Sequence, residues 1–332
     1  MTQRFKVVIT DFITGVPETE NRILGDIADI VPLDAYDEKE LLGKVEDANA
    51  LMLYHNLIIS RATIERLKNC KLIVRCGVGF DNVDRIYARE RGIPVANVPD
   101  YGTEEVADSA IGLTLALTRG INQFNSLLRG DAKKEWTYTH FAPILRLRGR
   151  VFGIVGLGRI GTAAALRAKA LGMDVVFYDP LKPDGYDKAL GIRRADTLND
   201  LLQQAFVLSL HCPLTPDTRG MITARTIAKM PRGSFLVNTA RGAVVETAAI
   251  PDAIASGQLA GAAIDVLAIE PPPADDPFLK AWRDPNHPAH HRVIVNPHSA
   301  FYAEEGLLDM RVKGSQACRK ALLGQPLLNV VN

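Results

Sequence analysis

The chain has 332 residues, a length typical of two domains. Its 39 Lys and Arg residues nearly balance 38 Asp and Glu residues, so the net charge of +1 indicates no nucleic-acid or membrane partner. No apolar run approaches the roughly 20 residues of a membrane span, and the N-terminus has no signal-peptide pattern. The four cysteines lack CxxC and zinc spacings, so we expect no disulfide, no metal site and a cytoplasmic protein.

The first third of the chain alternates short apolar runs with helical patterns. The runs predict strands at Phe5–Ile9, Ala50–Tyr54, Leu72–Arg75 and Pro94–Asn97. A helix is predicted over Ser60–Asn69, with Ser60 as its N-cap. Such alternation predicts an α/β fold with a parallel sheet covered on both faces.

A long helical pattern, Thr103–Leu128, follows, and we expect Gly112 and Gly120 to interrupt it. Its apolar residues lie on more than one face, which predicts burial by its own domain or by a partner.

A second βα series begins at Val151. Six strands are predicted, at Val151–Val155, Asp174–Tyr178, Ala205–Leu210, Ser234–Asn238, Gly261–Val266 and Val293–Asn296. Thr197 and Asp200 have the spacing of a capping box before the next helix. The Pro- and His-rich stretch Pro271–His291 is predicted as a loop, and Ala303–Leu323 as an amphipathic helix.

The most informative motif is a glycine turn, Gly156-Leu157-Gly158-Arg159-Ile160-Gly161, placed between a predicted strand and a predicted helix. Its first glycine allows the tight turn, the second lets a pyrophosphate approach, and the third lets the helix pack on the strand. Asp179 follows the next strand, where an acid can bind ribose hydroxyls and disfavour a 2′-phosphate. The motif therefore predicts a dinucleotide cofactor, and NAD rather than NADP. The nearby Lys182 weakens only the preference for NAD over NADP.

Nearly the whole chain resembles the D-isomer-specific 2-hydroxyacid dehydrogenases, and it is most similar to their C-terminal-binding-protein branch. The matching motifs beyond the glycine turn include Val74–Asp84, Leu210–Leu214, Val237–Gly242, Ala263–Val266 and Asn296–Ala300. The resemblance implies two Rossmann-like or flavodoxin-like domains, with the cofactor domain inserted into a discontinuous substrate domain. We therefore expect a substrate domain at 1–102 and 299–332, and an NAD-binding domain at 103–298.

The resemblance also implies three catalytic residues, Arg241, Glu270 and His298. Arg241 would bind the carboxylate and polarise the carbonyl of a 2-oxo acid, because its planar fork matches these groups. His298 would be the general acid in reduction and the base in oxidation. Glu270 would stabilise the imidazolium, and a Glu rather than the Gln of formate dehydrogenases favours 2-hydroxy acid chemistry.

The remaining site residues also follow from the resemblance. Cofactor contacts are predicted for the glycine turn (Gly156, Gly158, Arg159, Ile160, Gly161) and for Asp179, His211, Cys212, Thr218, Thr239, Ala240 and Asp265. The alternative for Asp265 is a strand-end cap. Substrate contacts are predicted for Tyr54, His55, Arg75, Val78, Gly79 and Phe301. The alternative for Arg75 is a role at the strand end, and Phe301 replaces a Trp of the C-terminal-binding-protein branch.

Two departures qualify the resemblance. The interval from Glu270 to His298 is longer than expected, with the extra length in Ala281–His291, and a surface insertion is favoured there over a lid. The chain also stops at Asn332, without the long tail of the animal corepressors in the branch. The missing tail and the otherwise minimal chain favour an NAD-dependent D-2-hydroxyacid dehydrogenase acting on a small 2-oxo or 2-hydroxy acid.

The alternative is an NAD(H)-sensing dimeric scaffold that binds partner proteins, and phosphite oxidation is a minor third possibility. In each case we expect a homodimer that uses residues 103–128.

Overall fold

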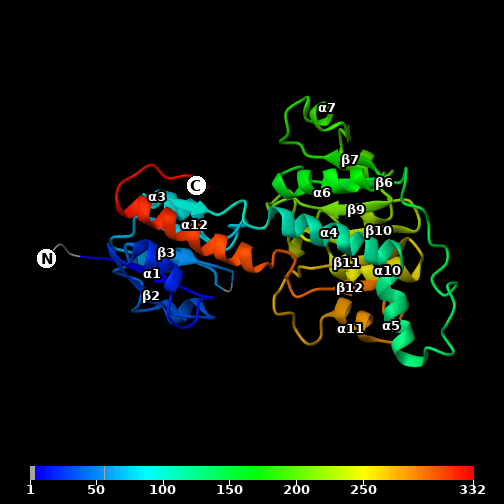
Figure 1. Cartoon of the computed structure of the whole chain (residues 1–332), viewed down its shortest axis with the longest axis horizontal. Helices are drawn as coiled ribbons and strands as arrows, with labels where there is room; N and C mark the ends of the chain where they lie inside the picture. The colour runs from blue at the N-terminus through cyan, green and yellow to red at the C-terminus, as the bar shows by residue number, and fades with distance from the viewer. Residues whose placement is uncertain (1–3, 56) are drawn as a thin grey trace. The chain divides into compact units, whose positions relative to one another are not determined.

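The computed structural model describes residues 4–55 and 57–332, and the chain divides into two compact units (Figure 1). The first unit consists of residues 1–102 and 302–332, and the second unit of residues 103–301. Residues 1–3, where the predicted substrate domain begins, lie outside the described residues. The assignment of the substrate to the first unit stays a prediction.

The first unit contains a parallel sheet of five strands within its described residues, in the order β2-β1-β3-β4-β5. This is the doubly wound order of flavodoxin-like folds, whose switch point lies between the first and third strands. The strands are β1 (Phe5–Ile9), β2 (Ala28–Pro32), β3 (Ala50–Leu53), β4 (Leu72–Arg75) and β5 (Val95–Asn97). The helices are α1 (Glu18–Leu24), the 3₁₀ helix η1 (Glu38–Leu41), α2 (Arg61–Arg66), α3 (Arg85–Glu90) and α12 (Glu304–Leu322).

The last helix, α12, binds the C-terminal part of the chain to the rest of the first unit. Arg311 on α12 makes two hydrogen bonds, of 2.8 and 2.7 Å, to the carboxylate of Glu20 on α1, whose side chain is fully buried. A Cβ on Gly314 would lie 2.6 Å from Cys76 Sγ, so α12 packs closely on the residue that follows β4. The buried ion pair and this close contact hold the two chain segments of the first unit together.

The second unit contains a parallel sheet of seven strands within its described residues, in the order β12-β11-β10-β9-β6-β7-β8. The strands are β6 (Val151–Val155), β7 (Asp174–Tyr178), β8 (Arg193–Arg194), β9 (Val207–Leu210), β10 (Ser234–Asn238), β11 (Leu259–Ile264) and β12 (Val293–Val295). The helices are α4 (Thr103–Thr118), α5 (Ile121–Asp131), α6 (Arg159–Ala170), α7 (Tyr186–Leu190), α8 (Leu198–Leu202), α9 (Ala224–Ile227), α10 (Ile250–Ala255), α11 (Pro277–Arg283), and the 3₁₀ helices η2 (Gly242–Val244) and η3 (Thr247–Ala249).

This order reproduces the dinucleotide-binding arrangement in which the first and fourth strands of the unit, β6 and β9, lie side by side. The strand order reverses at this point, and ligands of such sheets bind beyond the carboxyl ends of the strands there. The glycine turn follows β6, and His211 follows β9. The fold therefore places the predicted cofactor residues at the expected crevice, and the predicted α/β class with parallel sheets is confirmed.

The structure corrects the long helix predicted over Thr103–Leu128. Gly120 divides it into α4 and α5, because its φ of +68° is a left-handed conformation that ends a helix, whereas Gly112 continues α4. The apolar residues of α4, including Ile111 and Leu117, pack on the seven-stranded sheet in one core with Phe152. The unit's own sheet thus buries most of the apolar surface of α4.

The stretch predicted as a loop, Pro271–His291, also contains a helix, α11, so that prediction was wrong. Asp276 caps the helix by accepting a hydrogen bond of 2.9 Å from Leu279 N. Phe278 and Leu279 are buried in the core of the second unit. Two buried apolar residues gave too little periodic signal for the sequence to indicate this short helix.

Most other predicted elements agree with the structure to within two residues. The main differences are α2, which ends at Arg66, and the edge strands β2 and β8, which were not predicted. Ser60 caps α2, and Thr197 and Asp200 form the predicted capping box. Among residues 4–55 and 57–332, no helix is long and apolar enough to cross a membrane, and no His, Cys, Asp or Glu cluster could hold a metal ion.

Candidate active site

The glycine turn has the geometry expected of a phosphate-binding loop. Gly156 has a φ of +89°, and a Cβ there would lie 2.8 Å from Cys212 Cα. A Cβ on Gly161 would lie 2.1 Å from Gly156 O, so the glycine lets α6 start directly against the turn. Apart from the glycine and its chain neighbours, a Cβ on Gly158 would meet no atom of the described residues within 4 Å, which leaves open space before the first residues of α6, Arg159 and Ile160. An anion can approach the N–H groups of this helix end.

Asp179 follows β7 and lies beside the glycine turn. Its Oδ2 accepts a hydrogen bond of 2.8 Å from Leu157 N, and its Oδ1 accepts one of 2.9 Å from Leu181 N. The nearby Lys182 ammonium lies 4.8 Å from the centre of the Tyr186 ring. The backbone thus orients the carboxylate at the position where an acid binds adenosine ribose in dinucleotide folds.

The residues after β9 form the opposite wall of the crevice. His211 Nε2 lies 2.8 Å from Ser209 Oγ, and burial lowers the pKa of His211 to about 4, so its ring is neutral at pH 7. Its Nδ1 is buried and has no hydrogen-bond partner among the described residues. Cys212 is buried, and burial raises the pKa of its thiol to about 11. Thr218 donates its hydroxyl to Pro213 O at 2.7 Å, so its hydroxyl stabilises the turn.

The turn after β10 presents Arg241. The fully buried Asn238 donates a hydrogen bond of 3.0 Å to Arg241 O and accepts one of 3.0 Å from Ala240 N. The guanidinium donates from Nη1 to Ala240 O at 2.8 Å. Thr239 Oγ1 is buried and has no hydrogen-bond partner among the described residues. Asn238 fixes this turn, although the sequence prediction did not include it.

Gly242 lets two site loops meet. A Cβ there would lie 1.9 Å from the carbonyl carbon of Leu267 and 2.2 Å from its oxygen, a distance that no side chain can occupy. Leu267 N in turn donates a hydrogen bond of 2.7 Å to Glu270 Oε1. The close approach at Gly242 therefore sets the position of Glu270 relative to Arg241.

We predict that Gly242→Ala separates these loops. The clash should destabilise the protein by about 1–3 kcal/mol. Urea unfolding would measure this loss of stability. Gly112→Ala is the matched control, because a Cβ there meets nothing within 4 Å, and it should stabilise the helix by about 0.5–1 kcal/mol. Equal stability of Gly242→Ala and the natural protein would contradict the role assigned to this contact.

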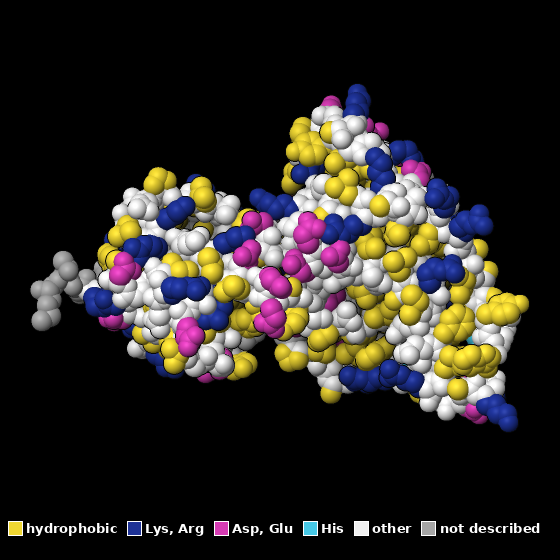
Figure 2. Space-filling model, viewed as in Figure 1, with side chains coloured by type: hydrophobic (Ala, Val, Ile, Leu, Met, Phe, Trp, Pro, Cys, Tyr) yellow, Lys and Arg dark blue, Asp and Glu magenta, His cyan; other side chains and the backbone are white. Residues whose placement is uncertain are grey.

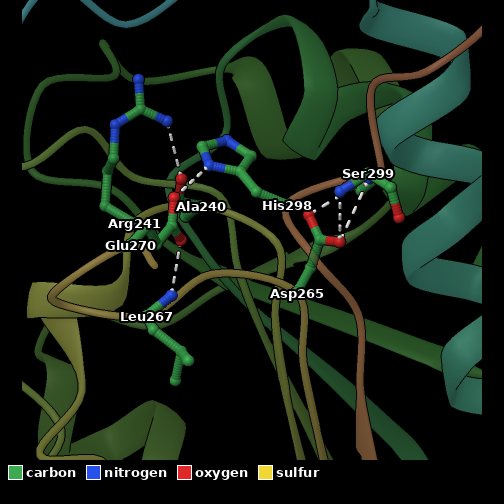
Figure 3. Close-up of polar contacts among 8 residues, drawn as sticks. Ala240, Arg241, Asp265, Leu267, Glu270, His298 and Ser299 are labelled. Carbon is green, nitrogen blue, oxygen red and sulfur yellow. Dashed lines mark hydrogen bonds and ion pairs between the residues drawn. The ribbon is translucent and has the colours of Figure 1, made fainter. Parts of the chain in front are cut away.

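Figure 3 shows the side chains of Arg241, Glu270 and His298 gathered together, with the Glu270 carboxylate beside the His298 imidazole. Glu270 Oε2 lies 2.7 Å from His298 Nδ1, and the two side chains are about one-third exposed. Burial alone would raise the pKa of Glu270. The hydrogen bond and charge of His298, the Leu267 N–H and the nearby Arg241 outweigh burial, and the pKa of Glu270 is lowered. Glu270 is therefore ionised at neutral pH and able to hold a protonated histidine.

Asp265, at the end of β11, holds the backbone of His298 in an unusual conformation. His298 has a φ of +54°, and its N–H donates to Asp265 O at 2.8 Å. The buried carboxylate accepts hydrogen bonds from Ser299 N at 2.9 Å and Ala300 N at 3.1 Å (Figure 3). Burial raises the pKa of Asp265 in spite of these bonds. A left-handed non-glycine residue held by three such bonds is typical of a functional site.

Phe301 lies close to the same histidine. Its ring centre is 6.0 Å from that of His298, and the two rings meet edge to face. The structure thus brings the predicted pocket wall Phe301 to the predicted catalytic residue.

The other predicted substrate residues belong to the first unit. Tyr54 is fully buried, with its ring 5.1 Å from that of Phe12, and so has no exposed surface with which to line a pocket. His55, next in the chain, is exposed. Arg75 is buried at the end of β4 and donates to Cys76 O at 3.0 Å. This hydrogen bond is what a strand-end role would require.

Val78 and Gly79 lie in a partly exposed loop of the first unit. Val78 O accepts a hydrogen bond of 2.7 Å from Asn97 Nδ2. Asn97 ends β5, so one polar side chain fixes the loop that is predicted to receive a substrate carboxylate.

The second unit fits a bound dinucleotide. The open space at Gly158 suits a pyrophosphate, and Asp179 suits a ribose. The buried Thr239 Oγ1 and His211 Nδ1 have no hydrogen-bond partner among the described residues. An additional group is needed to satisfy these polar atoms. These features lie along the carboxyl edge of one sheet, from β7 through β6 and β9 to β10.

Comparison with known proteins agrees with this geometry. Residues 111–300 match the NAD-binding domain of the D-isomer-specific 2-hydroxyacid dehydrogenases. The chain is 35% identical to D-3-phosphoglycerate dehydrogenase of Methanocaldococcus jannaschii over 98% of its own length and 59% of that protein. It is 33% identical to C-terminal-binding protein 1 of Caenorhabditis elegans over 94% of its length and 43% of that protein. The chain thus spans about half the length of these curated relatives.

The match to a solved structure spans a larger share of the other protein than the matches to these relatives do. D-lactate dehydrogenase from Aquifex aeolicus, in complex with NAD and lactic acid, is 26% identical with a TM-score of 0.85, over 96% of each chain. The second unit is an NAD-binding domain, and the family consists of NAD-dependent oxidoreductases that act on the CH–OH group of 2-hydroxy acids. The chain belongs to the D-isomer-specific 2-hydroxyacid dehydrogenase family.

Proposed function

We propose that this protein is an NAD-dependent D-2-hydroxyacid dehydrogenase that reduces small 2-oxo acids. The observation that carries the proposal is the 2.7 Å pair of His298 and Glu270 beside Arg241, at the carboxyl ends of β10 to β12. This arrangement combines a cation for a carboxylate with a proton donor whose charged form is stabilised. Family membership supports the same reaction class.

NADH, when bound, supplies the hydride that reduces C2 of the substrate. Arg241 binds the substrate carboxylate and polarises the adjacent carbonyl. His298 donates the proton that the carbonyl oxygen needs as its negative charge develops, and it accepts that proton in the reverse direction. Because Nδ1 is bonded to Glu270, we assign proton transfer to Nε2. Glu270 holds the ring in place and stabilises the imidazolium.

The substrate pocket follows from the same proposal. We assign the loop at Val78 and Gly79 to the substrate carboxylate, and Phe301 to the wall beside the side chain. A phenylalanine is smaller than tryptophan, so the pocket should accept substrates with a larger side chain than glyoxylate. His55 and Arg75 are secondary candidates, and Tyr54 is the weakest because it is buried.

Glu270→Gln should move the pH profile of reduction to lower pH. The lowered pKa of Glu270 keeps this carboxylate ionised above the acidic range, where it favours protonated His298. The neutral amide removes that charge, so the proton donor is lost at a lower pH. Initial rates between pH 5 and 9 would show the shift.

The matched control for this change is Glu135→Gln. Glu135 pairs with His140 at 2.9 Å and neither is among the residues assigned to the site, so the variant should keep the natural profile. Identical profiles for Glu270→Gln and the natural protein would argue against the pairing.

We also propose a homodimer in the cytoplasm. The sheet of the second unit buries most of α4, so the contact would use exposed apolar side chains of α5 and of the segment after it, including Ile121, Trp136 and Tyr138. Figure 2 shows apolar side chains gathered on the face of the second unit where α4 and α5 run. A monomeric mass in sedimentation would contradict the dimer.

The alternative of an NAD(H)-sensing scaffold is supported by the similarity to C-terminal-binding protein 1. NADH oxidation with glyoxylate, pyruvate, hydroxypyruvate, 2-oxo-4-methylthiobutyrate and phenylpyruvate separates the two functions. Rapid turnover of at least one acid supports the dehydrogenase. Tight NADH binding without turnover favours the scaffold.

A further inference from the structure

We propose that Phe12 is a specificity-determining residue that selects 2-oxo acids with an aromatic side chain, an inference that rests on the function proposed above. Phe12 lies in the loop that follows β1, outside the motifs that carry the family resemblance. The residues already assigned to the substrate in the first unit follow β3 and β4. Strands β1, β3 and β4 are parallel neighbours, so the loops that follow them lie at one edge of the sheet. Ligands of such sheets bind at this edge, near the switch point between β1 and β3.

The Phe12 ring stacks on the tyrosine that was expected to line the substrate pocket. Its centre lies 5.1 Å from that of the Tyr54 ring, with 23° between the two planes. It lies 5.2 Å from the centre of the His55 imidazole, with the planes tilted by 56°. Tyr54 is fully buried, whereas Phe12 is partly exposed and His55 is exposed. The surface at this position is therefore formed by Phe12 and His55 in place of Tyr54.

The backbone at Phe12 has a conformation that a large side chain rarely adopts. Its φ is +72°, and Ile13 N donates a hydrogen bond of 2.9 Å to Asp11 O across it. A positive φ spanned by such a bond indicates the rare and strained form of the γ-turn. Strained backbone costs stability and is concentrated at functional sites. Packing alone therefore does not account for a partly exposed phenylalanine at this position.

Buried polar contacts fix the turn and join it to the end of β3. Asp11 and Thr10 are fully buried. Asp11 Oδ1 accepts hydrogen bonds of 2.8 Å from Tyr54 N and 2.8 Å from Thr10 Oγ1. Thr10 N donates to Met52 O at 2.9 Å. The aromatic surface is thus in place before a substrate arrives, which lowers the ordering cost of binding.

The chemistry of this surface favours a planar apolar group. Aromatic rings prefer stacked or edge-to-face contacts with their centres about 4.5–7 Å apart, and such contacts contribute beyond the area that they bury. The phenyl group of phenylpyruvate can make this contact with Phe12, whereas the methyl group of pyruvate cannot. The two acids share the same carboxylate and carbonyl, so only the side chain distinguishes them. We expect a higher kcat/KM for phenylpyruvate than for pyruvate.

The test compares these two acids in the natural protein and in variants of Phe12. Phe12→Asn removes the ring, and asparagine tolerates a positive φ, so the turn should persist. The kcat/KM for phenylpyruvate should fall at least about tenfold, the loss of one aromatic contact and its buried area, and that for pyruvate should change little. Phe12→Gly also removes the backbone strain and should give the same result. Phe12→Tyr keeps the ring and should retain the preference.

The matched control is Phe5→Asn. Phe5 is also partly exposed, but it lies at the amino end of the same strand, where the Lys71 ammonium is 4.8 Å from the centre of its ring. This variant should keep the natural ratio of the two kcat/KM values. A purely structural role of Phe12 would lower both values together, so the ratio distinguishes the two roles. Thermal unfolding would show that each variant is folded.

A binding measurement keeps this inference separate from the proposed function. Calorimetric titration of the full chain saturated with NAD⁺ gives the affinity for each acid in a complex that has no hydride to transfer. If the protein reduces none of the acids, the proposed function fails. Tighter binding of phenylpyruvate than of pyruvate, lost in Phe12→Asn and kept in Phe12→Tyr, would still support the inference about Phe12.

Three results would overturn the inference. One is a natural protein that binds neither acid, treats the two alike or prefers pyruvate. Another is the same ratio of the two acids in Phe12→Asn and in the natural protein. The third is an equal loss of the preference in Phe12→Tyr and Phe12→Asn, because the ring is then not its cause. Reduction of either acid in such a case would leave the proposed function intact.

Discussion

Replacing His298 with asparagine should lower kcat for 2-oxo acid reduction by about 10²- to 10⁴-fold, the usual contribution of a positioned general acid. Asparagine is the informative substitution, because His298 has a φ of +54° and asparagine tolerates this conformation far better than alanine. The backbone bonds to Asp265 should therefore persist. Pre-steady-state transients would show whether the loss lies in the chemical step.

The control for this prediction is His140→Asn, which disrupts another histidine–carboxylate pair of the second unit, His140 with Glu135. It should leave kcat unchanged. Affinity for NADH should change less than threefold in both variants, because neither side chain is assigned to the cofactor. Full activity of His298→Asn would contradict the role of this histidine as proton donor.

Replacing Arg241 with glutamine should lower kcat/KM by about 30- to 5,000-fold, since removing one partner of a desolvated charge pair costs about 2–5 kcal/mol. Arg241→Lys should recover only part of the activity, because an ammonium cannot present the planar fork that matches a carboxylate. Steady-state kinetics with pyruvate or a larger 2-oxo acid would measure both variants.

The Arg241 variants should also fold normally. The contacts that fix the turn come from Asn238 to the Arg241 backbone and to Ala240 N, so they do not need the guanidinium. Arg225→Gln is the matched control and should retain natural kinetics. A kcat/KM within threefold of the natural value for Arg241→Gln would contradict substrate binding by this residue.

The sequence was most informative where local chemistry alone determines structure. The glycine turn requires a left-handed backbone conformation at Gly156 and close approach of Gly161 to the backbone of Gly156. No other residue type satisfies both requirements. The buried strands β6, β7 and β10 have continuous apolar runs, and their ends agree with the predicted ones. Such features depend on nearest neighbours in the chain, so they can be predicted without tertiary contacts.

Elements that depend on distant contacts were missed. Strand β2 is a short edge strand that contains Asp29 and ends in Pro32, and β8 consists of two arginines, one of which pairs with Asp174. Charged residues and prolines in an edge strand protect a sheet from pairing with another chain. They also interrupt the apolar pattern from which a strand is predicted. Helix α11 depends on the core around Phe278, and the division of α4 from α5 depends on which of two glycines adopts a positive φ.

The resemblance names residues of the candidate site but not the contacts that hold them in place. Resemblance named Arg241, Glu270 and His298, and the structure places them together with Asp265. It could not show that Asn238 holds the turn of Arg241, or that Gly242 admits the Leu267 backbone. Both roles depend on contacts between loops that are distant in the chain, and no local pattern of residues marks such contacts.

Transfer of deuterium from NADH to the substrate tests the central claim most directly. The natural protein would be incubated with a 2-oxo acid that it reduces, or with pyruvate as the default, and NADH deuterated at both C4 positions. We predict one deuterium at C2 of the product, in the D-configured hydroxy acid. Bound NADH without labelled product for any acid of the series, or an L-configured product, would contradict the account.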